Sequence, residues 1–124
     1  MNHSPDCLFC KIAQGQIPAN KVYEDADFIA FHDIHPKAPL HLLLIPKAHI
    51  VSLMQVEASH QALLGKMLVL APELAKQNGS PGGFRVGINN GRVGGQEVYH
   101  LHMHILGGPE PIGTQAGDES VNRQ

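Results

Sequence analysis

The segment from His100 to Leu106 alternates histidines with apolar residues, in the order His-Leu-His-Met-His-Ile-Leu. A period of two is typical of a β-strand, in which successive side chains point to opposite faces of the sheet. We therefore expect His100, His102 and His104 to line one face, and the apolar residues to pack into a core behind them. Neighbouring imidazoles on that face would lie roughly 6.5 Å apart, so that all three could meet one substrate.

Length and composition indicate one globular domain spanning residues 1–124. The chain is 43% hydrophobic and 16% charged, which is typical of a folded protein. Its ends, residues 1–5 and 109–124, consist mostly of polar residues, proline and glycine, and we expect them to be extended or mobile.

Charge and hydropathy exclude two classes of partner. The formal net charge is −2, so the chain lacks the basic surface that is typical of nucleic-acid-binding proteins. No apolar run approaches the ~20 residues of a membrane span. The N-terminus has neither the basic nor the apolar segment of a secretory signal, and we therefore expect a cytoplasmic protein.

The order of apolar runs and turn residues predicts several short strands and one short helix. Asp6 is expected to cap this helix, which ends near Gly15. Strands are expected at residues 21–24, 28–32, 41–45, 84–89 and 100–106. Pro46 should end the third of these strands, because proline cannot donate to a sheet ladder.

One longer helix lies between the third and fourth strands. Ser52 and Gln55 suggest a capping box over a short turn, and the main helix is expected to begin at Ser59. Pro72 should kink or interrupt it, because proline lacks an N–H and clashes with the preceding turn. A buried face is predicted at Leu64, Met67, Leu68, Ala71, Leu74 and Ala75. The fold class is therefore α+β, an antiparallel sheet of about five strands with one long and one short helix.

Histidines on one strand face suit chemistry at phosphorus. A free imidazole has a pKa near 6.5 and is mostly neutral at pH 7, so it can attack phosphorus and form a covalent intermediate. Flanking histidines can protonate a leaving group or hold phosphoryl oxygens. The glycine-rich segment 90–96 offers backbone N–H groups to an anion, although such a loop also serves as a plain hairpin connection.

The segment 94–108, which surrounds the three histidines, resembles the signature of the histidine-triad family in its nucleotide-binding, purine nucleoside phosphoramidase branch. The resemblance runs from about residue 8 to residue 108 and includes Phe31-His32-Asp33-Ile34, Ala38-Pro39-Leu40-His41, Ile45-Pro46-Lys47 and Ile88-Asn89. It implies a homodimer whose two sheets join across the interface. It also implies one purine nucleotide bound by each subunit.

The same resemblance implies roles in catalysis. His102 would attack the α-phosphorus and become nucleotidylated, His104 would hold the phosphate, and His41 would help to orient the triad. The loop amides that would also hold the phosphate are those of Gly95, Gln96 and Glu97.

Further positions match the family's nucleotide-binding residues. Asp33 would accept hydrogen bonds from the ribose hydroxyls, since an ionised carboxylate is only an acceptor. Asn89 would bind the sugar-phosphate region. The residues that match the purine-binding wall are Leu8, Phe9, Ile12, Phe31 and Ile34. Each of these five could equally be an ordinary core residue.

Cys7 and Cys10 form one C-x-x-C pair, which is half of a zinc site. In family members that carry this pair, zinc is also bound by the positions of His49 and His100. The resemblance therefore implies a structural Cys₂His₂ zinc site. The alternatives are two free thiols or a redox pair.

Two positions depart from relatives in the family. Glu97 stands where some relatives have a small hydroxyl residue that donates to the leaving group. An ionised glutamate cannot donate, so this role falls to His104 or to a protonated Glu97. The tail after Gly108 lacks the aromatic end of animal relatives, so their substrate preference does not carry over.

The leading functional hypothesis is hydrolysis of purine nucleoside phosphoramidates. A dinucleoside polyphosphate hydrolase of the same family is the alternative, although Gly107-Gly108 in place of a basic pair favours the former. A non-catalytic module that binds zinc and a nucleotide is a second alternative. The third is a metalloenzyme in which His100 and His102 share a catalytic metal.

Overall fold

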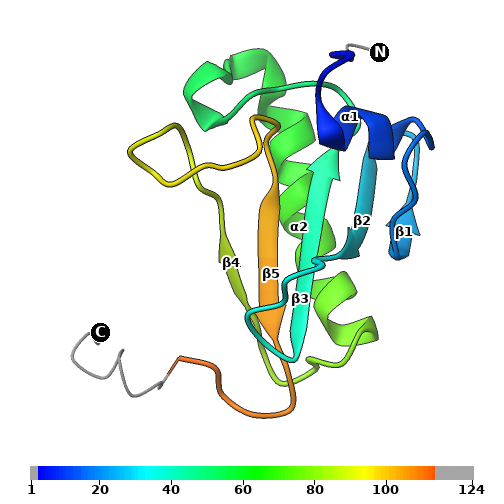
Figure 1. Ribbon diagram of the computed structural model, residues 1–124. Coiled ribbons are helices and arrows are strands. Elements are labelled where there is room, and N and C mark those ends of the chain that lie inside the picture. The colour runs from blue at the N-terminus through cyan, green and yellow to red at the C-terminus, as the bar shows by residue number, and fades with distance from the viewer. Residues whose placement is uncertain (1–2, 114–124) are drawn as a thin grey trace.

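The structure, a computed structural model, describes residues 3–113 and contains a five-stranded sheet, one long helix and several shorter helical turns (Figure 1). The predicted ends 1–5 and 109–124 lie partly outside the described residues. No helix among residues 3–113 is long and apolar enough to span a membrane. In chain order the elements are α1 (Leu8–Ala13), β1 (Lys21–Glu24), β2 (Phe28–His32), β3 (Leu40–Pro46), the 3₁₀ turns η1 (Leu53–Gln55) and η2 (Ala58–His60), α2 (Gln61–Gln77), β4 (Arg85–Gly87) and β5 (Met103–Gly107).

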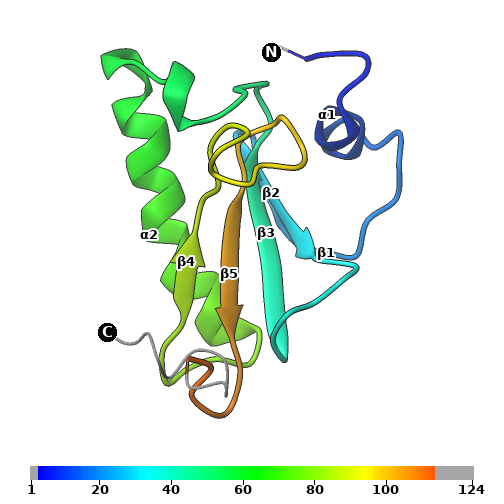
Figure 2. The ribbon, with the colours of Figure 1, turned by 60° about the vertical axis from the view of Figure 1, so that its left-hand side comes forward.

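The sheet is antiparallel throughout, in the order β1-β2-β3-β5-β4, which confirms the predicted α+β class. Helix α2 covers one face and α1 lies on the other (Figure 2). Every residue of the central strand β3 is buried. Its continuous apolar sequence follows from this position, because both of its faces are covered.

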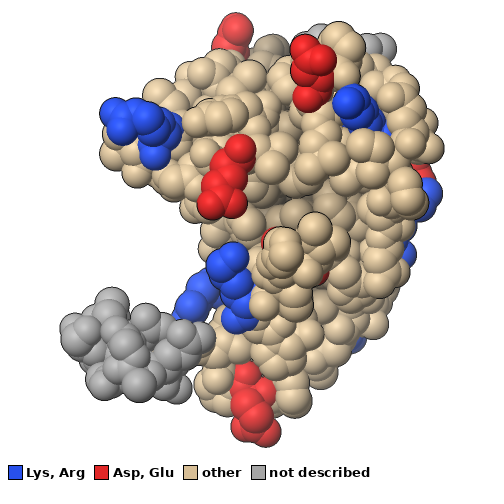
Figure 3. All heavy atoms as spheres, viewed as in Figure 1, with Lys and Arg blue, Asp and Glu red and all other residues tan. Residues whose placement is uncertain are grey.

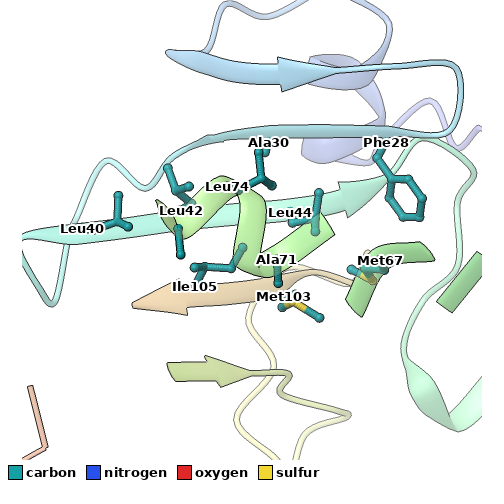
Figure 4. Close-up of a cluster of buried hydrophobic side chains, with 11 residues drawn as sticks. Phe28, Ala30, Leu40, Leu42, Leu44, Met67, Ala71, Leu74, Met103 and Ile105 are labelled. Carbon is teal, nitrogen blue, oxygen red and sulfur yellow. The ribbon is translucent and has the colours of Figure 1, made fainter. Parts of the chain in front are cut away.

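Alternate residues of β3 supply two separate cores. Leu42 and Leu44 point toward α2 and pack with Met67 and Leu74 of that helix (Figure 4). Leu43 and Ile45, on the opposite face, pack with α1 in a cluster of Phe9, Ile12, Ala13, Ile29, Phe31, Leu43 and Ile45. The strand period thus fixes which residues support the helix and which remain available to a site.

The short helix α1 is capped by Cys7, so the prediction of Asp6 as its cap was wrong. The Cys7 Sγ atom accepts a hydrogen bond from the Cys10 N–H at 3.3 Å. Asp6 is exposed and lies one residue too early to reach the amides of the first turn. Both cysteines therefore lie at the start of α1.

Helix α2 differs from the prediction in its start and its exposed face. It begins at Gln61, two residues after Ser59, because residues 58–60 form a 3₁₀ turn closed by reciprocal hydrogen bonds between Glu57 and His60. Pro72 is exposed and does not interrupt the helix, since its missing N–H frees only a carbonyl near solvent. Leu68 is 57% exposed rather than buried.

Strand β5 is shorter than the alternating segment that predicted it. Its ladder with β3 begins where Met103 faces Leu44, and the chain bends before that point. Leu101 is buried as expected, and its N–H donates to the Ile50 carbonyl at 2.6 Å, outside the sheet. His100 and His102 therefore precede the strand, so the three histidines do not share one flat strand face.

Candidate active site and metal centre

A pocket of about 780 Å³ opens on the sheet face opposite α2. This volume lies in the range of small-molecule sites. Its wall includes most residues predicted from the sequence: Phe9, Phe31, Asp33, Ile34, His41, Asn89, Gly95, Glu97, His102 and His104. Gln96 and the four predicted metal ligands lie outside its wall.

His102 is held in one tautomer by a backbone carbonyl. Its Nδ1 atom lies 2.7 Å from the His100 carbonyl oxygen, which can only accept, so the ring proton is on Nδ1. The Nε2 atom of the neutral ring then keeps its lone pair. The edge-on ring of Phe9, 5.1 Å from the His102 centroid, limits rotation of the imidazole. This arrangement supplies a nitrogen nucleophile to the pocket.

A chain of hydrogen bonds sets the tautomers of His41 and His104. The Lys37 N–H donates to His41 Nδ1 at 3.0 Å, so the proton of the neutral ring lies on Nε2. That Nε2 lies 2.9 Å from His104 Nδ1 and 3.3 Å from Asp33 Oδ2. His104 therefore carries its own proton on Nε2, a buried atom that has no partner among the described residues. A buried donor without an acceptor is costly, and it fits a ligand oxygen.

His41 and His104, which share this hydrogen bond, both favour the neutral state. Burial lowers the pKa of His104 to about 4, with help from the neighbouring His102 and His41 rings. Burial also lowers the pKa of His41, against the opposing charge of Asp33. At pH 7, His104 is therefore a neutral hydrogen-bond donor.

We expect His104 to make the stability of the protein depend on pH. Its pKa falls from an ordinary 6.5 to about 4 on folding, so the unfolded chain binds more protons between these values. This contribution is complete above pH 6.5 and is lost as the pH falls toward 4. We expect the free energy of unfolding, measured with urea, to fall between pH 7 and pH 4.5. The fall for wild type should exceed that for His104→Gln by on the order of 1 kcal/mol or more. Equal losses in the two proteins would contradict this.

The glycine-rich loop is held together by Gln96, which is buried. Its Oε1 accepts from the Gly91 N–H at 2.8 Å, and its Nε2 donates to the Val51 carbonyl at 2.6 Å. The backbone N–H groups of Gly95 and Gln96 donate to carbonyls within the loop. Among the three predicted phosphate-holding amides of the described chain, only that of Glu97 has no protein acceptor.

The predicted purine wall divides into two kinds of residue. Phe9 and Phe31 are buried, lie edge to face at 5.6 Å, and belong both to the core and to the pocket. Leu8 and Ile34 are 45% and 85% exposed and line the pocket, so they are not core residues. Their exposure is consistent with a binding role.

The four predicted metal ligands come together beside this pocket. Cys7 Sγ lies 3.2 Å from His100 Nδ1, and Cys10 Sγ lies 3.3 Å from His49 Nδ1. All four ligand atoms lie within 4.8 Å of one another. Tetrahedral zinc with two sulfur and two nitrogen ligands needs separations of about 3.5 Å, so the set fits this ion.

The protonation of His100 also suits a metal. Its Nε2–H donates to the Pro46 carbonyl at 2.8 Å, so Nδ1 presents a lone pair to the thiols. Burial lowers the pKa of His100 to about 4, which keeps this lone pair free. These residues would hold the ion at the start of α1, away from the pocket wall.

Some pocket residues were not predicted from the sequence. Gly87 faces His104 across the β4–β5 ladder, and Leu106 faces His41 across the β3–β5 ladder, so both lie on the pocket side of the sheet. Lys37 lines the pocket from the loop before β3. Strand register would have identified the first two, but the alternating pattern alone does not give register.

Comparison with known proteins agrees with this fold and site. The family model described as "Scavenger mRNA decapping enzyme C-term binding" matches residues 6–116. Protein HitA of Neisseria gonorrhoeae is 57% identical over 104 residues, which cover 84% of this chain and 97% of that protein. The purine nucleoside phosphoramidase of Escherichia coli (strain K12) is 45% identical over 117 residues, which cover 94% and 98%.

Solved structures show the same likeness. A histidine triad protein from Clostridium difficile matches with a TM-score of 0.84 and 43% identity, over 91% of this chain and 99% of that one. A zinc-bound histidine triad family protein from Mycobacterium smegmatis matches with a TM-score of 0.71 and 31% identity, over 83% of this chain and 75% of that one.

The fold and the histidine-lined pocket thus define a class of small α+β hydrolases. The chain belongs to the histidine-triad (HIT) family.

Proposed function

We propose that this protein hydrolyses purine nucleoside phosphoramidates through a nucleotidylated His102. The observation that carries the proposal is the 2.7 Å hydrogen bond from His102 Nδ1–H to the His100 carbonyl, which leaves Nε2 as the nucleophile. The named activity of the E. coli relative, at 45% identity, supports the same substrate class.

The substrate is placed by matching its parts to the pocket wall. The purine lies against the apolar residues at the α1 end, where Phe9 and Phe31 pack edge to face. The ribose hydroxyls donate to Asp33, and Asn89 binds the sugar-phosphate region. The α-phosphoryl oxygens accept from His104 Nε2–H and from the Glu97 amide.

The reaction proceeds in two displacements at the α-phosphorus. The His102 Nε2 lone pair forms a bond to phosphorus, while the bond from phosphorus to the amine nitrogen breaks. The amine leaves with that electron pair and takes a proton from a protonated Glu97 or from the solvent beside it. Water then attacks the same phosphorus and gives a proton to the solvent, while the bond to His102 breaks with its electron pair returning to Nε2, which releases the nucleoside monophosphate.

The pKa of His104 bears on which group protonates the amine. With a pKa of about 4 it is neutral at pH 7, which suits a donor to a phosphoryl oxygen rather than an acid. The protonating role, for which the sequence left two candidates, therefore falls to Glu97 in its protonated form or to the solvent beside it.

Turnover of adenosine 5′-monophosphoramidate tests this function directly. Release of AMP and ammonia, with an adenylated protein trapped on rapid quenching, supports the proposal. Faster turnover of a dinucleoside polyphosphate would favour the alternative hydrolase, and binding of AMP without turnover would favour a non-catalytic module. A catalytic metal shared by His100 and His102 is disfavoured, because His100 Nδ1 faces Cys7 and Cys10.

Zinc is assigned to the cluster of Cys7, Cys10, His49 and His100, where it would have a structural role. The donor set matches zinc, and a zinc-bound relative shares the fold. Cys7 and Cys10 are free thiols in this structure, which suits the reducing cytoplasm that we propose as the location.

A homodimer is proposed on the β4 edge of the sheet. Strand β4 is an edge strand, and Val86 within it and Phe84 just before it are each 40% exposed. On α2, Leu68 and Val69 are 57% and 71% exposed. An edge strand next to apolar surface favours pairing with a second copy across a two-fold axis.

We expect light scattering at micromolar concentration to give twice the 13.4 kDa chain mass. Such an interface should bury on the order of 2,000 Å² or more. Val86→Arg places two like charges near the two-fold axis and should lower the mass toward the monomer. Val93→Arg, at a loop position 91% exposed, is the matched control and should stay dimeric. A wild-type monomer with full activity would exclude this dimer.

A further inference from the structure

The side chain of Lys37 lies beside the reacting groups, and the proposed reaction gives it no role. It lies in the loop between β2 and β3, and its N–H donates to His41 Nδ1 at 3.0 Å. It lines the main pocket together with His41 and His104. It also lines a second hollow of about 280 Å³, whose other walls are residues 38–39 and 109–112. The two hollows therefore meet at Lys37.

No carboxylate within residues 3–113 forms an ion pair with Lys37, and Glu110 is the one carboxylate that lines the second hollow with it. Three other lysines are paired: Lys21 and Lys47 contact Glu24 at 2.9 and 2.7 Å, and Lys66 contacts Asp25 and Asp27. The Asp33 carboxylate, which is nearest in the sequence, accepts from the His35 N–H and contacts His41 instead. An unpaired cation in a pocket is available to an anionic ligand.

The field of this ammonium reaches the reacting side chains. Burial is the main cause of the lowered pKa values of His41 and His104, and the positive charge of Lys37 lowers both further. The charge is thus felt at the position where the proposed phosphoryl group would lie.

A second cation lies on the same face of the sheet. Arg85 on β4 faces Leu106 of β5, which in turn faces His41 of β3, so the three side chains share one face. The Arg85 guanidinium lies against Gly113. In Figure 3, which looks onto the side opposite α2, basic side chains gather below an indentation of this face.

In the placement proposed above, the base and the sugar contact the apolar wall and Asp33 rather than Lys37. The apolar wall belongs to α1 and its neighbours, and Asp33 takes the ribose. The pocket wall away from α1 contains Gly87, Leu106 and Lys37. Gly87 contributes no side chain there, and a Cβ built on it would meet nothing within 4 Å, so this end has room for the group displaced from phosphorus.

We propose that Lys37, assisted by Arg85, determines leaving-group specificity by binding an anionic group there, such as the carboxylate of an amino acid joined to phosphorus through its amine. This inference rests on the proposed function and refines its substrate class. A carboxylate and the next phosphate of a polyphosphate share the relevant chemistry, and the experiment distinguishes them.

The test compares adenosine 5′-phosphoramidates of glycine and of glycinamide, which differ by one negative charge at the same position. Wild type should prefer the glycine compound in kcat/KM by about two- to fivefold at low ionic strength. The preference should shrink as salt is added, because the cations are exposed. Lys37→Gln should remove most of this preference, measured as the ratio of kcat/KM for the two compounds, and Arg85→Gln should remove less. Lys76→Gln, which changes an exposed lysine on the far helix α2, is the matched control and should keep the preference.

Diadenosine tetraphosphate provides the second arm. A larger loss in Lys37→Gln on glycine than on this compound assigns a carboxylate, and the reverse assigns a phosphate. Equal kinetics for the two glycine compounds in wild type, or a preference that Lys37→Gln retains, would overturn the proposal while the phosphoramidase function stands. Failure of wild type to hydrolyse any phosphoramidate would instead overturn both the role of Lys37 and the proposed phosphoramidase function.

Discussion

Alanine at position 102 should lower kcat on adenosine phosphoramidates by at least about 10⁴-fold, because the covalent route is lost with its nucleophile. The fold should survive, since the side chain makes one hydrogen bond, to the His100 carbonyl, and packs against Phe9. AMP should still bind, because the apolar wall, Asp33 and His104 are unchanged. Steady-state kinetics and calorimetric titration with AMP measure the two effects separately.

His35→Ala is the matched control for this substitution. His35 is an exposed histidine on the pocket wall, and only its backbone N–H has a hydrogen bond, to Asp33. This variant should keep kcat within a few-fold of wild type and form the adenylated intermediate, which His102→Ala cannot form. Near-wild-type turnover by His102→Ala would show that His102 is not the nucleophile.

Removal of zinc should lower Tm by at least about 10 °C, since the free energy of binding a structural metal adds to that of folding. Protein purified without added metal should contain one zinc per chain. Cys10→Ser should lose most of this zinc and melt near the temperature of the chelated protein. Burial raises the pKa of the Cys10 thiol, so without a cation to stabilise the thiolate this group stays a neutral thiol.

Readdition of metal provides the control for the chelator. Zinc should restore the wild-type Tm, whereas magnesium, which prefers oxygen ligands, should not. In Cys10→Ser neither ion should restore it. Purified protein with only traces of zinc, together with a Tm that chelator leaves unchanged, would contradict the assignment.

Much of the fold could be predicted because the local patterns agree with it. The strands at 21–24 and 28–32 are as expected, and the alternation at Leu101, Met103 and Ile105 correctly predicted buried side chains. The ends of β4 and β5 could not be predicted, because a strand extends only as far as its partner pairs with it. Leu68 was misplaced for a related reason: its helical spacing indicates a face but not how far one subunit covers it.

The candidate site was predicted from types of residue and from the family resemblance. The structure adds the direction of each hydrogen bond within the site. Sequence alone cannot tell which nitrogen of His41 or His104 carries the proton, since this depends on the Lys37 amide four residues before His41. The engagement of the Gly95 and Gln96 amides within their own loop likewise follows from the turn geometry. Lys37 lies in the loop between two motifs and has no periodic pattern, so nothing in the sequence marked it.

The brevity of α1 has a thermodynamic consequence. Six residues are too few for a helix that is stable by itself, so α1 depends on what holds it at its two sides. Cys7 and Cys10 hold it from the side of His49 and His100, and Leu8 and Phe9, between these cysteines, face the pocket. A ligand on either side therefore restricts the same segment. Binding of the second ligand then loses less conformational entropy than it would in the free protein. We therefore expect positive linkage between the proposed metal and the proposed nucleotide, so that each raises the affinity for the other by the same factor.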